Sequence, residues 1–283
     1  MVSRNESEVG FRLQQSRNRR HPATFMINNI TDTNFADDLA LISETIEQAQ
    51  LFLLRVENCA AQVGLHANAD KTKYMTYNLE DSYLKSLSGA DIEHVDDFLY
   101  LGSWVDTSEK DLNTRIAKAW SAMSKMEVIW KTNLERKLKI NFFRATVETV
   151  LLYGCTTWTL TKALERKLDG TYTRLLRTAL NIKWQTHTTN AVLYGNLPRI
   201  TTTIKNRRLK FAGHCFRSKD EVVQPLIMWE PRHGKRRRGR PAKTFIDQLM
   251  DDTEITKEDL PGAMNAREIW RQVVHGVRPR MPR

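Results

Sequence analysis

The stretch Phe35–Leu41, with the sequence FADDLAL, places two adjacent carboxylates between short apolar runs. Apolar, β-prone residues precede it from Thr24 to Ile30, with Asn28-Asn29 just upstream. This pattern predicts a β-hairpin whose tip or neck carries Asp37 and Asp38. Neighbouring side chains on a strand point to opposite faces. We therefore expect one aspartate to face a bound cation, while the other stabilises the turn or completes the coordination shell of that cation.

Paired aspartates at a hairpin fit the chemistry of two-metal phosphoryl transfer. That reaction needs carboxylates that converge on cations about 3.5–4 Å apart. Magnesium takes hard oxygen ligands, usually with only one or two carboxylates, and completes its shell with water and phosphate. A solvated Asp-Asp turn is the common alternative, so the pair by itself does not decide between the two interpretations.

The residues after the hairpin predict a small α+β module. Ser43 or Thr45 can cap a helix, whose apolar residues recur at helical spacing as far as Gly64. Residues 73–77 predict a strand, and residues 97–105 predict a hairpin with a tight backbone approach. The order strand, strand, helix, strand, hairpin indicates one helix packed on a sheet.

Beyond residue 110 the sequence takes on helical periodicity. Helices are expected over residues 112–134, 142–157 and 164–180. Interruptions are expected at Gly154 and Gly170. A basic amphipathic stretch begins at Arg207, and a short final helix over 244–250 precedes a tail around Trp270.

Charge is strongly segregated in this chain of 283 residues and net charge +11. Residues 23–111 carry net −11, whereas residues 112–204 and 205–243 each carry net +10. An acidic segment suited to cations, followed by basic segments suited to a polyanion, predicts a nucleic-acid partner. The alternative is that the charged faces only solubilise helices.

Cysteine content and hydropathy indicate an intracellular protein that is not secreted. The three cysteines, Cys59, Cys155 and Cys215, are too few and too scattered for a disulfide framework. The uncharged, largely apolar run at residues 149–161 is too short to span a bilayer. We therefore expect a nuclear or cytoplasmic location and no membrane partner.

Three motifs, in order along the chain, resemble those of one enzyme family. FADD at residues 35–38 resembles the [FY]-x-D-D palm signature of reverse transcriptases. GLHANADKTK at residues 64–73 is similar to the next palm motif, and FLYLG at residues 98–102 resembles the primer grip. Segments 151–158, 209–214 and 239–241 extend the likeness to the reverse transcriptase of non-LTR (LINE-type) retrotransposons, the endonuclease-reverse transcriptase.

The resemblance spans roughly residues 24–250 and implies an α+β fold. It implies a truncated palm of antiparallel sheet plus helix, an all-α thumb-like region, and a basic, partly disordered C-terminal segment. The expected boundaries are a disordered basic lead-in over 1–22, a partial palm over 23–110, a helical thumb-like region over 111–204, and a nucleic-acid-binding region over 205–283.

The resemblance also implies roles for particular residues. Asp37 and Asp38 would be the catalytic pair and would hold Mg²⁺ or Mn²⁺. Lys73 would lie near the phosphates of the incoming nucleotide, with a solvent-exposed lysine at a strand edge as the alternative. The primer terminus would be positioned by Phe98, Tyr100, Leu101 and Gly102. The partners implied are an RNA template and a DNA primer.

The sequence departs from active members of this family before Asp37. They supply another essential aspartate from an earlier palm strand and a nucleotide-selecting helix, and an endonuclease domain lies further upstream. Here Asp32 is the only aspartate before Asp37, and the other acidic residues are Glu6 and Glu8. We therefore predict that the chain alone does not polymerise DNA. The alternatives are a non-catalytic DNA- or RNA-binding protein and a non-functional relic.

A basic tract near the C-terminus forms the second candidate site. Arg238-Gly239-Arg240-Pro241 resembles an AT-hook core, which can lie in a narrow A·T minor groove of duplex DNA. A nuclear-localisation signal and a basic linker remain open. The candidate nucleic-acid-binding residues are Arg207, Arg208, Lys210, Lys235, Arg236, Arg237, Arg238, Arg240 and Lys243. His214, Cys215 and His233 lack paired ligand spacing, so no zinc is expected.

Overall fold

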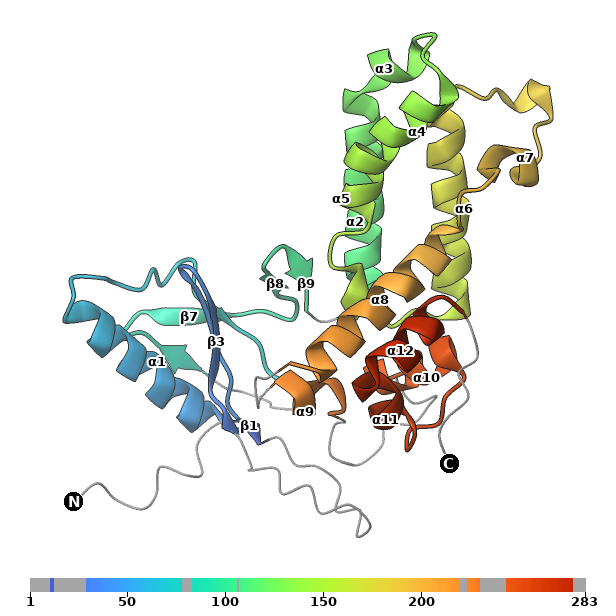
Figure 1. Ribbon diagram of the computed structural model, residues 1–283. Coiled ribbons are helices and arrows are strands. Elements are labelled where there is room, and N and C mark those ends of the chain that lie inside the picture. Colours follow the sequence, from blue (N-terminus) through green and yellow to red (C-terminus); the bar gives the residue numbers. More distant parts are fainter. Residues whose placement is uncertain are drawn as a thin grey trace. The chain divides into compact units, whose positions relative to one another are not determined.

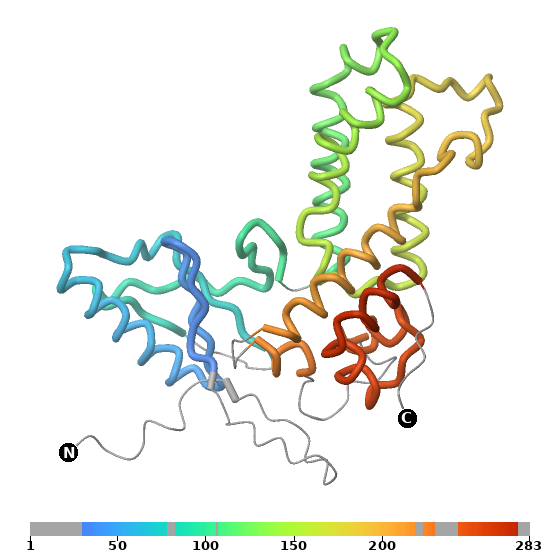
Figure 2. The backbone as a smooth tube through the Cα atoms, in the orientation of Figure 1, coloured from blue at the N-terminus to red at the C-terminus, as the bar shows by residue number. Residues whose placement is uncertain are grey.

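The computed structural model describes residues 11–12, 29–77, 83–105, 107–218, 223–229 and 243–276. The chain divides into two compact units, Met1–Gly102 and Ser103–Arg283, named unit 1 and unit 2 here. In Figure 2 the described part of unit 1 runs from blue to teal, and that of unit 2 from green to red. Most of the expected disordered lead-in over 1–22 and most of the basic tract lie outside the described residues, but Phe11–Arg12 within that lead-in form a short strand paired with Asn29–Ile30.

Unit 1 combines one helix with short strands (Figure 1). Its elements are β1 Phe11–Arg12, β2 Asn29–Ile30, β3 Asp32–Phe35, β4 Asp38–Leu41, α1 Ile46–Ala61, β5 Lys73–Tyr74, β6 Leu84–Lys85, β7 Asp91–His94 and β8 Leu99–Tyr100. The strand order β5-β7-β6 includes a parallel pair, β5 with β7, and β3 and β4 form a separate hairpin. The expected single antiparallel sheet is therefore replaced by several small sheets in the described residues.

The helix predicted after the aspartates is confirmed as α1. Its N-cap is Thr45, whose side chain accepts a hydrogen bond from the N–H of Gln48 at 3.3 Å. The side chain of Gln48 reaches back to the N–H of Glu44, one residue before the cap. Gly64 follows the helix with φ of +77°, a conformation that glycine adopts without steric cost.

Two polar contacts attach α1 to the β6–β7 region. The amide of Gln50 both donates to and accepts from the backbone of Lys85, at 2.7 and 2.8 Å. The buried carboxylate of Glu57 accepts from the N–H of Leu87 at 2.6 Å. These contacts use backbone groups of Lys85 on the edge strand β6 and of Leu87 just after it, so they fix α1 in the absence of a large apolar interface.

Unit 2 is built from helices. They are α2 Ser108–Lys125, α3 Glu127–Lys131, α4 Arg136–Phe143, the π-helical turn η2 Arg144–Glu148, α5 Thr149–Leu151, η3 Cys155–Thr157, α6 Lys162–Ala179, η4 Trp184–Thr186, α7 Asn190–Tyr194, α8 Ile200–Phe216, α9 Val223–Ile227, α10 Phe245–Thr253, α11 Leu260–Asn265 and α12 Arg267–Val274. The short strand β9, Ser103–Trp104, precedes them.

The first hydrophobic core of unit 2 packs α2, α4, α5 and α6 together (Figure 1). Asp111 of α2 is 2% exposed and accepts from the indole N–H of Trp158 at 2.8 Å and the backbone N–H of Trp104 at 3.2 Å. Gly154, with φ of +71°, passes so close to Ser103 that a Cβ would lie 2.5 Å from its Oγ. The segment LLYGCTTW at 151–158 therefore owes its glycine and tryptophan to packing around Asp111.

The second core of unit 2 packs α10, α11 and α12 against the C-terminal half of α8. Trp270, expected in a tail, lies in α12, is 2% exposed and donates its indole N–H to the carbonyl of Leu209 at 2.7 Å. A Cβ on Gly213 would lie 2.1 Å from the Trp270 indole nitrogen, so α8 needs glycine there. The expectation of a tail is thus corrected, because the indole fills the space over Gly213.

Two further expectations for unit 2 change with the structure. Helix α6 runs uninterrupted through Gly170, because glycine lowers helix stability without breaking a well-packed helix. The expected boundary at 204/205 falls inside α8, a single helix. Ile200 and Ile204 belong to the first core, and Leu209 belongs to the second.

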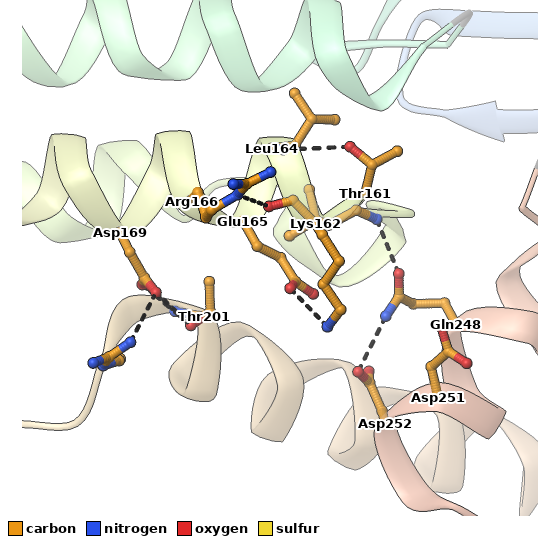
Figure 3. Close-up of polar contacts among 12 residues, drawn as sticks. Thr161, Lys162, Leu164, Glu165, Arg166, Asp169, Thr201, Gln248, Asp251 and Asp252 are labelled. Carbon is orange, nitrogen blue, oxygen red and sulfur yellow. Dashed lines mark hydrogen bonds and ion pairs between the residues drawn. The ribbon is translucent and has the colours of Figure 1, made fainter.

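Polar contacts link α10 to the rest of unit 2 (Figure 3). The side chain of Gln248 accepts from the backbone N–H of Leu160 at 2.9 Å and donates to Asp252 at 3.1 Å. Asp252 in turn pairs with the buried guanidinium of Arg208. Near the start of α8, Asp169 accepts from Thr201. The start and the middle of α8 are thus held by separate polar contacts, in addition to the packing of the two cores.

Candidate functional site

The hairpin that carries the aspartates closes with a two-residue turn. Phe35 pairs with Asp38, so Ala36 and Asp37 form the turn. Ala36 has φ of +54° and Asp37 does not share this sign, as in a type II′ turn. A residue with a Cβ is strained at this position, which glycine normally occupies. The turn therefore projects Asp37 at the tip and leaves Asp38 at the first position of β4.

Both aspartates of the hairpin are exposed to solvent. Within the described residues, neither carboxylate forms a side-chain hydrogen bond or an ion pair. Their neighbour Phe35 is 65% exposed. The arrangement leaves two oxygen-donor groups available at the tip, with little desolvation to overcome.

The structure brings Tyr100 of the expected primer grip to this hairpin. The hydroxyl of Tyr100 lies 3.3 Å from the Oγ1 of Thr33 and 3.4 Å from its carbonyl. Thr33 shares a face of β3 with Phe35, and Phe35 is paired with Asp38. Phe98 stacks on Tyr100 with ring centroids 6.5 Å apart. The two motifs that the sequence placed 60 residues apart are thus adjacent within unit 1.

The other two members of the expected primer grip form a turn. Leu101 and Gly102 have φ of +48° and +80°, and they lie between β8 and β9. The tight backbone approach expected near Gly102 takes the form of this turn. Their role toward a primer stays a prediction.

The described residues do not bring a third metal ligand to the aspartates. No group of three or more His, Cys, Asp and Glu side chains suited to a metal occurs in the part of the chain that the structure describes. Asp32 pairs with Leu41, three positions along β3 from the Phe35–Asp38 pair. At about 3.4 Å per residue, Asp32 lies about 10 Å from that pair along the strand. Among the residues that the structure describes, Asp37 and Asp38 therefore have no acidic companion close by.

Lys73, expected beside nucleotide phosphates, has a carboxylate partner in the structure. It lies on β5 opposite Glu93 of the parallel strand β7, and its ammonium pairs with the Glu93 carboxylate. The adjacent pair, Tyr74 and His94, makes an edge-to-face ring contact at 5.0 Å. A phosphate would have to compete with Glu93 for Lys73.

The candidate nucleic-acid-binding residues of α8 divide into exposed and buried. Arg207 and Lys210 are exposed. Arg208 is 2% exposed and ion-paired with Asp252, so the structure corrects its expected place in a phosphate-binding set. A buried charge retained by its partner cannot also contact a phosphate.

Helical spacing completes the exposed face of α8. Phe211 is 39% exposed, and His214 is also exposed, one turn beyond Lys210. The series Arg207, Lys210, Phe211 and His214 follows the i, i+3, i+4, i+7 pattern of one helix face. His214 was missed as a member of this series, although its spacing from Arg207 was visible in the sequence.

The remaining basic candidates lie around α10. Lys243, just before α10, pairs with Asp251 at 2.6 Å. The other candidates of the tract fall outside the described residues: Lys235, Arg236, Arg237, Arg238 and Arg240. The AT-hook, nuclear-signal and linker interpretations all remain open.

Comparison with known proteins indicates where the chain comes from. The chain is similar to a transposon-derived protein of Caenorhabditis elegans, with 29% identity over 248 residues that cover 83% of this chain and 88% of that protein. No family profile matches the chain. No solved structure matches it. The similarity supports a transposon origin.

Among the residues with a described structure, no helix combines the length and the apolar composition that a bilayer span requires.

Proposed function

We propose that this chain derives from the reverse transcriptase of a retrotransposon. Unit 1 would correspond to the C-terminal half of the palm, and the helices of unit 2 to a thumb and a nucleic-acid-binding region. The observation that carries the proposal is the contact of Tyr100 with Thr33. This contact supports the proposal, because a primer terminus aimed at metal ligands would require the expected primer grip to lie beside the expected catalytic hairpin. The transposon-derived relative supports the same origin.

The aspartates fit part of a metal site. Asp37 and Asp38 offer exposed carboxylates, the ligand type that Mg²⁺ or Mn²⁺ prefers. In the parent enzyme, a metal pair would activate the primer hydroxyl and stabilise the leaving pyrophosphate. Since the described residues bring no third acidic group to the hairpin, we propose that this polypeptide does not catalyse nucleotidyl transfer unaided.

If catalysis is incomplete, unit 2 can still bind nucleic acid by itself. Arg207 and Lys210 present two cations on one face of α8, and Phe211 lies between them and His214. Cations that track a phosphate backbone, interleaved with an aromatic ring, suit binding without sequence preference. This is the second candidate function, which would persist without catalysis.

Catalysis is tested with the purified chain, a primed RNA template, deoxynucleotides and Mg²⁺. We expect no primer extension above that of Asp37→Asn, which serves as the background control. Extension by the wild-type chain that disappears in Asp37→Asn would show that the site is complete and would overturn the second part of the proposal.

Binding is tested by the salt dependence of affinity for duplex DNA. Each phosphate contact contributes about 0.9 to the slope of log K against log salt. We expect the Arg207→Ala/Lys210→Ala double variant to lower this slope by about 1.8. Lys85→Ala, which removes an exposed lysine of unit 1, is the control and should leave the slope unchanged.

A further inference from the structure

One end of the first core of unit 2 carries a basic pocket. The end of α3, the start of α4 and the residues after α6 meet there (Figure 1). The pocket has a volume of about 350 Å³, and Lys131, Arg136, Lys139, Asn133 and Asn181 are among the residues that line it. Every charged group in its lining is therefore a cation.

Lys139 is the unusual member of this lining. The residue is 6% exposed, and its ammonium donates to the carbonyl of Trp130 at 2.7 Å. Within the described residues it has no carboxylate partner, whereas Lys131 pairs with Glu127 at 2.5 Å. A buried charge without a counter-charge is costly, and an anion in the pocket would offset that cost.

The loop that leaves this pocket displays a tryptophan. Ile182 lines the pocket, and Trp184, two residues later, is 78% exposed. Two residues span at most about 7 Å, so the backbone of Trp184 lies beside the pocket.

This loop is held in place by Arg177 of α6. Its guanidinium donates to the carbonyl of Thr188 at 2.7 Å and to the side chain of Asn190 at 2.9 Å. The hydroxyl of Thr186 donates to the carbonyl of Lys183 at 2.7 Å. An aromatic side chain on a loop fixed in this way loses little entropy when it stacks on a ligand.

The excess of basic side chains around Trp184 favours a negatively charged partner. Over residues 127–139 and 177–188 the basic side chains are Lys131, Arg136, Lys137, Lys139, Arg177 and Lys183, against only Glu127 and Glu135. A cationic surface with an exposed indole suits a polyanion that also carries aromatic bases.

We propose that this end of unit 2 binds single-stranded nucleic acid, with a backbone phosphate in the pocket at Lys139 and a neighbouring base stacked on Trp184. The inference rests on the proposed nucleic-acid binding and adds a contact made by residues other than Arg207 and Lys210. Stacking accepts any base, so no sequence preference is expected.

The test measures binding of the full chain to a fluorescein-labelled oligo(dT) of about 12 nucleotides by anisotropy, at about 50 mM salt. We expect Trp184→Ala to weaken binding by about five- to fiftyfold, and Trp184→Phe to retain most of it, because a phenyl ring still stacks. The matched control is Val192→Ala on α7, which is 66% exposed and should bind as the wild type does.

The pocket is tested separately with Lys139→Met. We expect weaker binding and a salt slope lower by about 0.7, the contribution of one phosphate on a single strand. Should thermal unfolding show that this variant is not folded, Lys131→Ala carries the same test, since Lys131 is exposed on the pocket rim.

The outcomes separate this inference from the proposed function. Wild-type affinity in Trp184→Ala, together with weaker duplex binding in the Arg207→Ala/Lys210→Ala variant, overturns only the present inference. A wild-type chain that binds neither oligo(dT) nor duplex DNA overturns both. Loss in Val192→Ala equal to that in Trp184→Ala would indicate a general apolar surface, such as a protein interface, and would also contradict the inference.

Discussion

Unit 2 encloses two large clusters of buried apolar side chains, whereas the described part of unit 1 encloses one small cluster. Two clusters form the interior of unit 2, and Phe143, Leu168, Leu175 and Leu209 among them have no exposed surface. The buried cluster of unit 1 consists of Leu53, Leu84 and Ile92, each still 5–7% exposed. The signature motifs therefore lie in the unit that has less apolar burial to stabilise it.

The difference shows that a segment of this chain can carry clear sequence motifs and still bury few apolar side chains. The aspartate hairpin is held by strand pairing and by the contact with Tyr100, while its Phe35 and Leu39 face solvent. Regions with few buried apolar contacts open at low free energy. We expect unit 1 to unfold before unit 2.

The largest effect is expected when the two units are produced as separate fragments. A fragment of residues 103–283 should retain its helical circular dichroism and a cooperative urea transition, because both cores lie within it. A fragment of residues 1–102 should show no cooperative transition, since the four buried apolar residues of its described part cannot offset chain entropy. A sharp transition in the shorter fragment would break the comparison.

The next test removes one side chain from each unit. Trp158→Ala should lower the free energy of unfolding by about 3–5 kcal/mol, because it opens a cavity and leaves Asp111 short of a donor. Leu53→Ala should cost less, about 1–2 kcal/mol, because its site in the smaller core can collapse. Urea denaturation measures both, and equal losses would argue against the contrast in packing.

Two glycines of unit 2 form a matched pair. Gly213→Ala should destabilise by about 1–3 kcal/mol, because its Cβ would collide with the Trp270 indole. Gly170→Ala meets no atom within 4 Å and should stabilise α6 by about 0.5–1 kcal/mol. Thermal unfolding should shift in opposite directions. The same sign for both would contradict the close approach of α12 to α8.

A smaller, pH-dependent effect is expected at the start of α10. The backbone N–H of Thr244, and then its hydroxyl, donate to Asp247 and hold the pKa of that carboxyl below its ordinary value. The stabilisation is therefore present above about pH 4 and is lost as the pH falls through the lowered pKa. Asp247→Asn should cost about 0.5 kcal/mol at pH 7. The two proteins should converge in stability as the pH falls below that lowered pKa, as measured by urea unfolding across pH.

The smallest effect is expected at the aspartates of unit 1. Asp37→Asn and Asp38→Asn should each change the free energy of unfolding by less than about 0.5 kcal/mol, because both side chains are exposed and form no side-chain hydrogen bond or ion pair with the described residues. A larger loss would show that the pair supports the hairpin, which would weaken its interpretation as a ligand site.

Local features of the fold could be predicted from the sequence. The aspartate hairpin and the capped helix α1 occur where turn chemistry and capping patterns placed them. These signals act over a few residues, so the sequence carries them directly. The strand expected over 73–77 shortened to Lys73–Tyr74, because strand length depends on partners that are distant in sequence.

Contacts between distant segments escaped prediction. Arg208 looked like a surface cation beside Arg207, yet Asp252, 44 residues away, holds it inside unit 2. Helical spacing separates the faces of α8 but does not say which face another helix covers. The pocket at Lys139 and the display of Trp184 depend on three segments meeting at one end of a core, and no local pattern marks them.

The sequence by itself determined the ordered motifs, the segregation of charge and the helical periodicity, because each is a property of residues close together in the chain. The tertiary structure alone decided which charges are buried, why Gly213 must be glycine, and that Tyr100 meets the aspartate hairpin at Thr33. The physical reason is that desolvation and steric exclusion depend on what packs against a residue. That neighbour is usually far away in the chain.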